Sequence, residues 1–136
     1  LSIIDRRSRE CILEKLDNKT SSSVCAKTID SLVAKMQNVH TIISDNGTEF
    51  TDHKDISEQL RIDYYFAHPY ASYERGSIEN LNGLVRQYIP KGTDFTDIQN
   101  IEVKEIQNKL NNRPRKILVF LTPIEYTTQY YNKIEN

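Results

Sequence analysis

Two carboxylates, Asp45 and Glu79, stand where they could contribute to a chemical site. Asp45 directly follows a β-rich run at residues 39–44, and open α/β sheets bind their ligands at the carboxyl ends of strands. Glu79 falls in the first turns of a helix predicted over residues 77–88, on the face opposite the apolar residues. An acidic residue on the polar face of a helix is usually only solvated, so periodicity alone leaves both interpretations open.

The elements that would position these carboxylates follow from hydrophobic periodicity and turn signals. Strands that alternate with helices predict an α/β layer fold in the order β-β-α-β-α-β-α-α-α. We expect strands at residues 1–4, 11–16, 39–44 and 62–67, and helices near 20–36, 52–60, 77–88, 96–112 and from 123 onward. On the third of these helices, the predicted apolar side consists of Ile78, Leu81, Val85 and Tyr88.

Several of the expected helices carry start signals, beginning with N-cap candidates at residues 20–23 for the first helix. Thr96 and Gln99 have the spacing of a capping box, in which the two side chains bond each other's backbone N–H groups. Pro123 after Thr122, with Glu125 following, marks the start of the last helix, because proline is well suited to the first helical position.

Composition sets the outer limits of what the chain can do. Its 136 residues suit one domain, and 38% hydrophobic with 27% charged residues is ordinary for a soluble protein. The longest apolar run, residues 117–121, is far short of a membrane span, and no export signal opens the chain. Cys11 and Cys25 lack the spacing of a zinc site, so we expect two buried, reduced thiols.

Several ordered motifs then narrow the function. The sequence at residues 44–50 and 68–80, which contains both carboxylates, resembles the catalytic core of DDE transposases and retroviral integrases. Residues 82–95, 110–116 and 122–125 make the chain similar to the bacterial insertion sequence 30 type of transposase. The 33 residues between Asp45 and Glu79 match the spacing of this group.

This resemblance implies a fold, a cofactor and roles for the two carboxylates. It implies a ribonuclease-H-like integrase core, with a mixed sheet flanked by helices and a C-terminal helical extension. Two Mg²⁺ (or Mn²⁺) ions are expected, with Asp45 bridging them and Glu79 holding one. Mg²⁺ prefers oxygen ligands, and two such ions can drive an in-line displacement at phosphorus.

The family triad needs a third carboxylate, and we do not assign it to Asp5. The segment Asp5-x-x-Ser-Arg resembles the second family strand, whereas the first catalytic Asp lies on the preceding, central strand near a Trp, and this chain has no Trp. We therefore expect the first strand to be missing from the chain, leaving a gap in the sheet, and the chain alone to be inactive. We divide it into a catalytic core at 1–95 and a C-terminal helical part of the same domain at 96–136.

The resemblance also implies DNA as the partner, both transposon ends and target. The formal net charge of −1 excludes a uniformly basic surface but permits local patches. Candidate phosphate contacts are Arg75, Arg86, Lys91, Arg113, Arg115 and Lys116. A solvated basic cluster remains the alternative for them. The aromatic run at 64–66 is interpreted as strand packing rather than a base-stacking platform.

The leading hypothesis is a fragment of a transposase that cleaves and joins DNA. Its intact parent would be a bacterial, cytoplasmic enzyme, homo-oligomeric because two transposon ends must be brought together, with no membrane or small-molecule partner. The alternative is a catalytically inactive remnant that only binds DNA or full-length transposase. A ribonuclease-H-like nuclease unrelated to transposition is a third possibility, which the transposase-like motifs at residues 112–115 and 122–125 disfavour.

Overall fold

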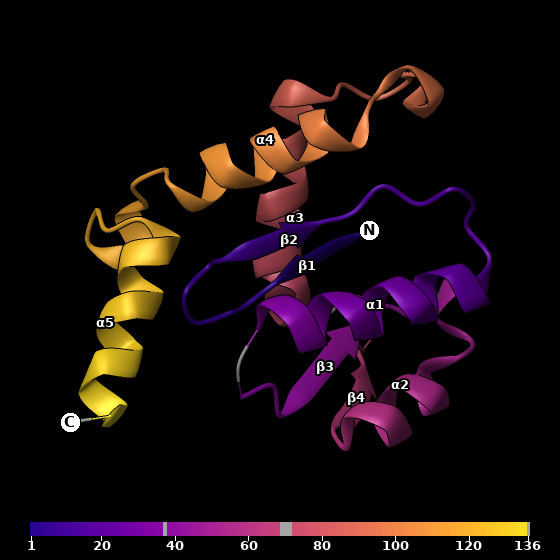
Figure 1. Ribbon diagram of the computed structural model, residues 1–136, viewed down its shortest axis with the longest axis horizontal. Helices are drawn as coiled ribbons and strands as arrows, with labels where there is room; N and C mark the ends of the chain where they lie inside the picture. Colours follow the sequence, from indigo (N-terminus) through magenta and orange to yellow (C-terminus); the bar gives the residue numbers. More distant parts are fainter. Residues whose placement is uncertain (37, 69–71, 136) are drawn as a thin grey trace. The chain divides into compact units, whose positions relative to one another are not determined.

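The structure, a computed structural model, describes residues 1–36, 38–68 and 72–135 (Figure 1). The side chains of residues 72–75, 131 and 133–135 are outside this description. The chain divides into two compact units, and each is described by itself. The first unit comprises Leu1 with Glu14–Gly76, and the second comprises Ser2–Leu13 with Ser77–Asn136.

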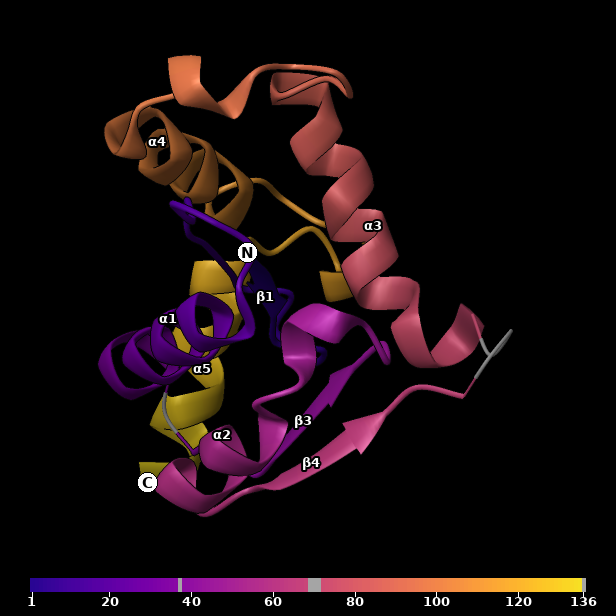
Figure 2. The ribbon, with the colours of Figure 1, turned by 90° about the vertical axis from the view of Figure 1, so that its right-hand side faces the viewer.

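The first unit is a parallel strand pair with two helices. Its elements are α1 (Ser21–Lys35), β3 (Thr41–Ser44), a 3-10 turn at Thr48–Phe50, α2 (His53–Leu60) and β4 (Asp63–Phe66). Strands β3 and β4 run side by side in the same direction, with Ile43 opposite Tyr65 (Figure 2). Helix α1 begins at the expected place, because the Thr20 hydroxyl accepts a hydrogen bond from the Ser23 N–H.

The core of the first unit lies on one face of this strand pair. Its buried members are Cys25, Ile56 and Ile62, with Ile29, Val39, Ile42, Leu60 and Tyr64 packed against them. Side chains alternate between the two faces along a strand, and Ile43 and Tyr65 accordingly stand on the opposite, exposed face. The aromatic run is thus divided between packing and solvent, because only Tyr64 and Phe66 face inward.

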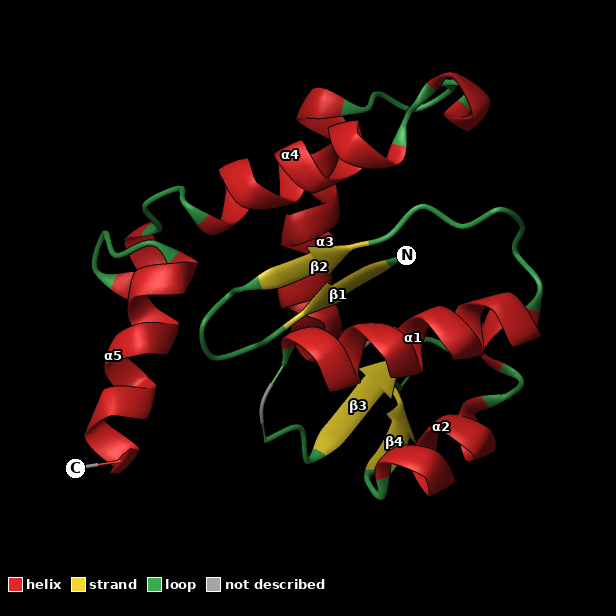
Figure 3. Cartoon of the chain, viewed as in Figure 1, coloured by secondary structure: helices red, strands yellow, loops and turns green. Residues whose placement is uncertain are grey.

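The second unit joins an antiparallel strand pair to three helices (Figure 3). Strands β1 (Ser2–Ile4) and β2 (Cys11–Leu13) pair with Ile3 opposite Ile12. The helices are α3 (Ser72–Tyr88), which enters this unit at Ser77, α4 (Asn100–Asn111) and α5 (Pro123–Glu135), with short 3-10 turns at Phe95–Asp97 and Lys116–Leu118. Both directions of strand pairing are therefore present, in two separate two-stranded sheets.

The core of the second unit is built by β2, α3 and α4. Its buried members are Cys11, Leu13, Leu81, Ile89, Val103, Ile106 and Leu110. The expected apolar side of α3 is confirmed at Ile78, Leu81 and Val85, which all belong to or pack against this core. Tyr88 was expected there too, but it is 41% exposed, and Leu84 packs against the core instead. Both cysteines are free and buried, as expected.

Two predicted helix starts are corrected. Helix α3 begins at Ser72, earlier than the expected 77. Thr96 and Gln99 do not form a capping box, because Thr96 lies in a 3-10 turn whose backbone is capped by Asp94. Helix α4 starts only at Asn100, and its N-cap Gln99 makes no side-chain capping bond.

The reciprocal capping pattern occurs instead at α5. The Thr122 N–H donates to Glu125 Oε1, and the Glu125 N–H donates to Thr122 Oγ1, each at 3.1 Å. Pro123 is the first helical residue, as predicted. Among the described residues, no helix has the length and apolarity needed to cross a membrane.

Candidate active site

Asp45 is the first residue after β3, at the carboxyl end of the parallel strand pair. Its side chain is exposed, and Oδ1 accepts a hydrogen bond from the Gly47 N–H at 3.0 Å. Its second oxygen, Oδ2, accepts no hydrogen bond within the described part of the chain. Asp45 therefore offers a hard carboxylate oxygen to solvent, which is the donor chemistry that a Mg²⁺ ion requires.

The backbone at Asp45 is held by a short chain of hydroxyl groups. The Tyr64 hydroxyl on β4 donates to Ser44 Oγ at 2.8 Å, and Ser44 Oγ donates to the Asp45 carbonyl at 2.9 Å. Burial raises the pKa of the Tyr64 phenol, the hydrogen bond with Ser44 lowers it, and the negative charge of Asp45 raises it again. Tyr64 thus keeps its proton and remains a hydrogen-bond donor at neutral pH.

Gly47 serves this loop by leaving space rather than by adopting an unusual backbone angle. Its φ is −75°, which any residue can adopt. A Cβ atom at Gly47 would lie only 2.6–2.9 Å from the carboxylate atoms of Glu49. The Asp-Asn-Gly turn signal therefore marks a place where Glu49 folds back over the loop, next to the Asp45 turn.

Glu79 lies on α3 in the second unit, and its side chain is exposed. Its neighbours Ile78 and Leu81 face the core of that unit, which fixes the side of the helix on which Glu79 stands. The space around Gly83, on the same side, is open within 4 Å. Asp45 and Glu79 thus belong to different units, and among the described residues no three His, Cys, Asp or Glu side chains gather into a metal-binding group.

Sequence reasoning missed a contact at Ser77, two residues before Glu79 on α3. Arg9 donates a hydrogen bond from Nη1 to the Ser77 hydroxyl on α3. Arg9 adopts a left-handed backbone conformation with φ 63°, in a turn where Asp5 Oδ1 accepts from the Arg7 N–H at 2.8 Å. Asp5 is therefore a turn residue. The sequence signal that could have pointed to this contact is the Asp5-x-x-Ser-Arg motif, which contains Arg9.

The six basic candidates divide by exposure. Four have exposed side chains on the second unit: Arg86, Lys91, Arg113 and Lys116. The Arg75 side chain lies outside the described residues. Arg115 does not fit the expectation, because it is only 9% exposed and its Nη2 donates to the Leu110 carbonyl at 2.9 Å. Arg115 bonds to the end of α4 and exposes little of its side chain to solvent.

Comparisons with known proteins identify the family. Residues 1–72, more than half of the chain, match the model of the integrase core domain. The transposase for insertion sequence element IS4351 of Bacteroides fragilis is 47% identical over 98% of this chain and 41% of the relative. The transposase InsI for insertion sequence element IS30A of Escherichia coli K12 is 35% identical over 91% of this chain and 33% of the relative.

The fold comparison agrees with the sequence comparison. The crystal structure of the catalytic core domain of BIV integrase matches 99% of this chain and 88% of its own chain, with a TM-score of 0.71 at 18% identity. This similarity confirms the expected ribonuclease-H-like integrase fold. The chain spans about two fifths or less of the length of these two transposases. By the match at residues 1–72, the chain belongs to the integrase core domain family.

Proposed function

We propose that this chain is part of the catalytic core of a transposase, which cleaves and joins DNA by metal-dependent phosphoryl transfer. The observation that carries the proposal is the exposed carboxylate of Asp45 at the end of β3, within the residues that match the integrase core domain. The transposases of Bacteroides fragilis and Escherichia coli, which are similar along nearly the whole chain, support the same reaction class.

In this proposal Asp45 and Glu79 bind divalent metal ions. Both are exposed carboxylates, which is the ligand type for Mg²⁺ or Mn²⁺. Two such ions, when bound, would supply activation of a water or 3′-hydroxyl group and stabilisation of the leaving oxygen. The Gly47 N–H supports Asp45 by orienting its carboxylate through the bond to Oδ1.

The DNA contacts in this proposal come from the exposed basic side chains of the second unit, Arg86, Lys91, Arg113 and Lys116. Each would neutralise a phosphate and release counterions, so binding would weaken as salt rises. Two transposon ends must be held together for joining, so we propose that the parent acts as an oligomer.

We also propose that residues 1–95 form the catalytic core and that 96–136 complete the same domain. The core of the second unit supports placing residues 96–136 in the same domain as α3, since Val103, Ile106 and Leu110 of α4 pack with Leu81 of α3. The third carboxylate of the triad would then come from a strand that precedes residue 1 in the parent.

The test is Mg²⁺-dependent nicking of transposon-end DNA by this chain, joined to the segment that precedes the matching region in the Bacteroides fragilis relative. We expect Asp45→Asn and Glu79→Gln each to lower the nicking rate by at least about 100-fold, since losing a direct ligand costs no less than losing a supporting group. Matched controls are Asp63→Asn and Glu102→Gln, exposed acids of the first and second unit, which should leave the rate unchanged.

Two outcomes would overturn parts of the proposal. Nicking that survives Glu79→Gln would remove Glu79 from the site. A joined protein that binds DNA but never nicks it would instead support the alternative of a remnant that only binds DNA or full-length transposase.

A further inference from the structure

A small cavity in the first unit opens beside the loop that follows Asp45. It has a volume of about 260 Å³, and its lining comes from three successive segments of the unit: Asn46, Gly47, Thr48, Phe50, Thr51, His53 and Phe66. Gly47 is hydrogen-bonded to Asp45, so the wall of the cavity is directly linked to the candidate catalytic carboxylate. The roles described above use none of its side chains.

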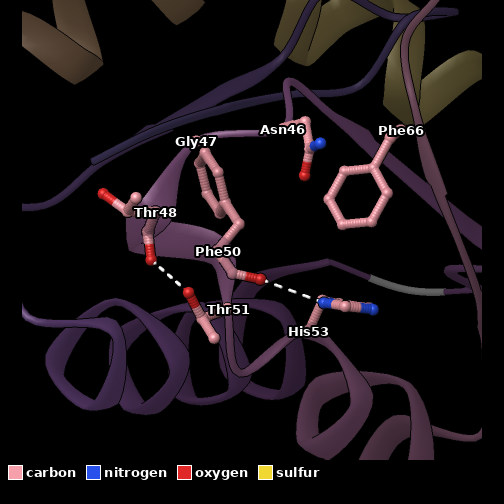
Figure 4. A pocket seen from close by; sticks show the side chains of 7 residues that line it. All are labelled: Asn46, Gly47, Thr48, Phe50, Thr51, His53 and Phe66. Atoms are coloured by element: carbon pink, nitrogen blue, oxygen red, sulfur yellow. Dashed lines mark hydrogen bonds between the residues drawn. The ribbon is translucent and has the colours of Figure 1, made fainter.

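Two aromatic rings bound the cavity. Figure 4 shows the Phe50 and Phe66 rings on either side, with the Asn46 amide above and the His53 ring below. Phe66 is held in place by His53, whose ring packs edge-on to it with centroids 4.8 Å apart. Within the described residues, Phe50 has no ring packed against its own. An aromatic face is therefore left open on the cavity side.

The hydrogen-bonding groups that line the cavity have defined donor and acceptor roles. His53 Nδ1 lies 3.1 Å from the Phe50 carbonyl, which can only accept, so Nδ1 carries a proton. The Asn46 side chain is exposed and makes no hydrogen bond within the described part of the chain, so its amide can both donate and accept. None of the described residues that line the cavity is Asp, Glu, Lys or Arg.

These features define the chemistry of the occupant. A volume below the ~300–1,000 Å³ of drug-sized sites admits one flat ring system rather than several linked groups. A lining without Lys or Arg among the described residues disfavours a phosphate or carboxylate, while open aromatic faces favour a planar ring. An amide at the rim can bond to the polar edge of a nucleobase, as Asn side chains do in base recognition.

We propose that this cavity binds one unpaired nucleobase of the DNA strand whose phosphate is processed at Asp45. The base stacks on Phe50, and the Asn46 amide bonds to its polar edge. This proposal rests on the proposed function, since it takes DNA as the ligand. It adds that the strand is held by a base as well as by its phosphates, next to the reacting group.

The experiment measures binding of this chain to end-labelled single-stranded oligonucleotides of about 10 nucleotides, within the ~4–16 nucleotides that one single-strand-binding domain contacts. Each oligonucleotide carries one abasic position, and fluorescence anisotropy gives the dissociation constant in the absence of metal. The same series is measured with Phe50→Leu, which removes the ring and keeps an apolar side chain. The matched control is Tyr65→Leu, an aromatic that is 53% exposed on the outer face of β4 and outside the cavity.

If the cavity binds a base, an abasic substitution at one position weakens binding to the unsubstituted chain by roughly 5- to 150-fold, the usual value of one base–aromatic stack. The same substitution has no effect on Phe50→Leu, which has already lost the stack, and keeps its full effect on Tyr65→Leu. Asn46→Ala, an exposed position that tolerates substitution, shows a smaller loss and a reduced preference among the four bases.

Equal abasic losses in the unsubstituted chain and in both cavity variants would overturn the base-binding proposal while leaving the proposed function intact. No binding to any oligonucleotide would also overturn the base-binding proposal, and nicking by the joined protein then decides the proposed function separately. The nicking assay is run on the joined protein with Phe50 in place, so a positive nicking result together with equal abasic losses overturns base binding alone.

Discussion

Asn111 and Cys11 are joined by a pair of hydrogen bonds between a helix side chain and a strand backbone. Asn111 Oδ1 accepts from the Cys11 N–H at 2.8 Å, and Asn111 Nδ2 donates to the Cys11 carbonyl at 2.9 Å. Two further residues of α4 bond to the backbone of Leu13. The Leu13 N–H donates to Gln107 Oε1, and the Leu13 carbonyl accepts from Lys104 Nζ. One face of α4 therefore satisfies the free edge of β2, which would otherwise be open to pairing with another chain.

The first prediction concerns this edge. Asn111→Ala leaves a buried N–H and a buried carbonyl of Cys11 without partners, so we expect a loss of about 2–4 kcal/mol in the free energy of unfolding. Urea denaturation measures it. Asn112→Ala is the matched control, because the neighbouring Asn112 is exposed and bonds only within its own helix, and it should cost under about 1 kcal/mol. Equal losses in the two variants would contradict the role of Asn111.

The second prediction follows from the thiol of Cys11. Burial is the largest cause that raises its pKa, from the ordinary 9.0 to about 11. A pKa that is higher in the folded than in the unfolded state gives stability that is full below pH 9 and is lost as pH rises through 11. Two pKa units correspond to about 2–3 kcal/mol.

Unfolding free energies at pH 8, 9.5 and 11 check this prediction. Lys and Tyr side chains also titrate in this window, so the informative quantity is the difference between the unsubstituted chain and Cys11→Ala. That difference should shrink as pH rises. A difference that stays constant across the window would show that the Cys11 thiol titrates alike in both states.

The third prediction distinguishes two possible caps. Thr122→Ala removes one side of the reciprocal pair with Glu125 and should cost about 1 kcal/mol of stability. Gln99→Ala should change stability by less than about 0.5 kcal/mol, because Gln99 makes no capping bond at α4. Thermal unfolding of both variants measures these losses. A larger loss for Gln99→Ala than for Thr122→Ala would support the predicted capping box at Thr96 and Gln99.

These caps illustrate what the sequence could predict of the fold. The four strands and the α1 cap at Thr20 were predictable, because alternation, periodicity and capping side chains act locally. The Thr96–Gln99 pattern misled because Asp94 competes for the same turn through its own side chain. The edge of β2 depends on contacts between residues about 100 positions apart, which local patterns do not contain.

Some features of the candidate site could likewise be predicted from local sequence, and others could not. The position of Asp45 at a strand end followed from turn signals and β-propensity. The burial of Arg115 could not be predicted in this way, because Arg113 and Arg115 carry the same charge and lie only two positions apart. Of these two, it is Arg115 whose guanidinium bonds to the end of α4. The aromatic cavity was also hidden, since Phe50, His53 and Phe66 belong to three different elements.

The fourth prediction separates these two arginines. Arg113→Gln should lower the slope of log affinity for duplex DNA against log salt by about 0.9, the contribution of one phosphate contact, with stability unchanged. Arg115→Gln should leave the slope unchanged and lower the unfolding free energy by about 1–3 kcal/mol, because it removes a buried bond to Leu110. A change of slope in Arg115→Gln alone would reverse the assignment.

The most direct measurement is a double-mutant cycle on nicking by this chain joined to the upstream segment of the Bacteroides fragilis relative. If Asp45 and Glu79 serve one metal-dependent reaction, Asp45→Asn and Glu79→Gln each lower the rate by at least about 100-fold. The double variant is then no slower than either single one, because residues that act as a unit are strongly non-additive. Losses that multiply in the double variant, or a single variant that keeps full activity, would contradict a shared site.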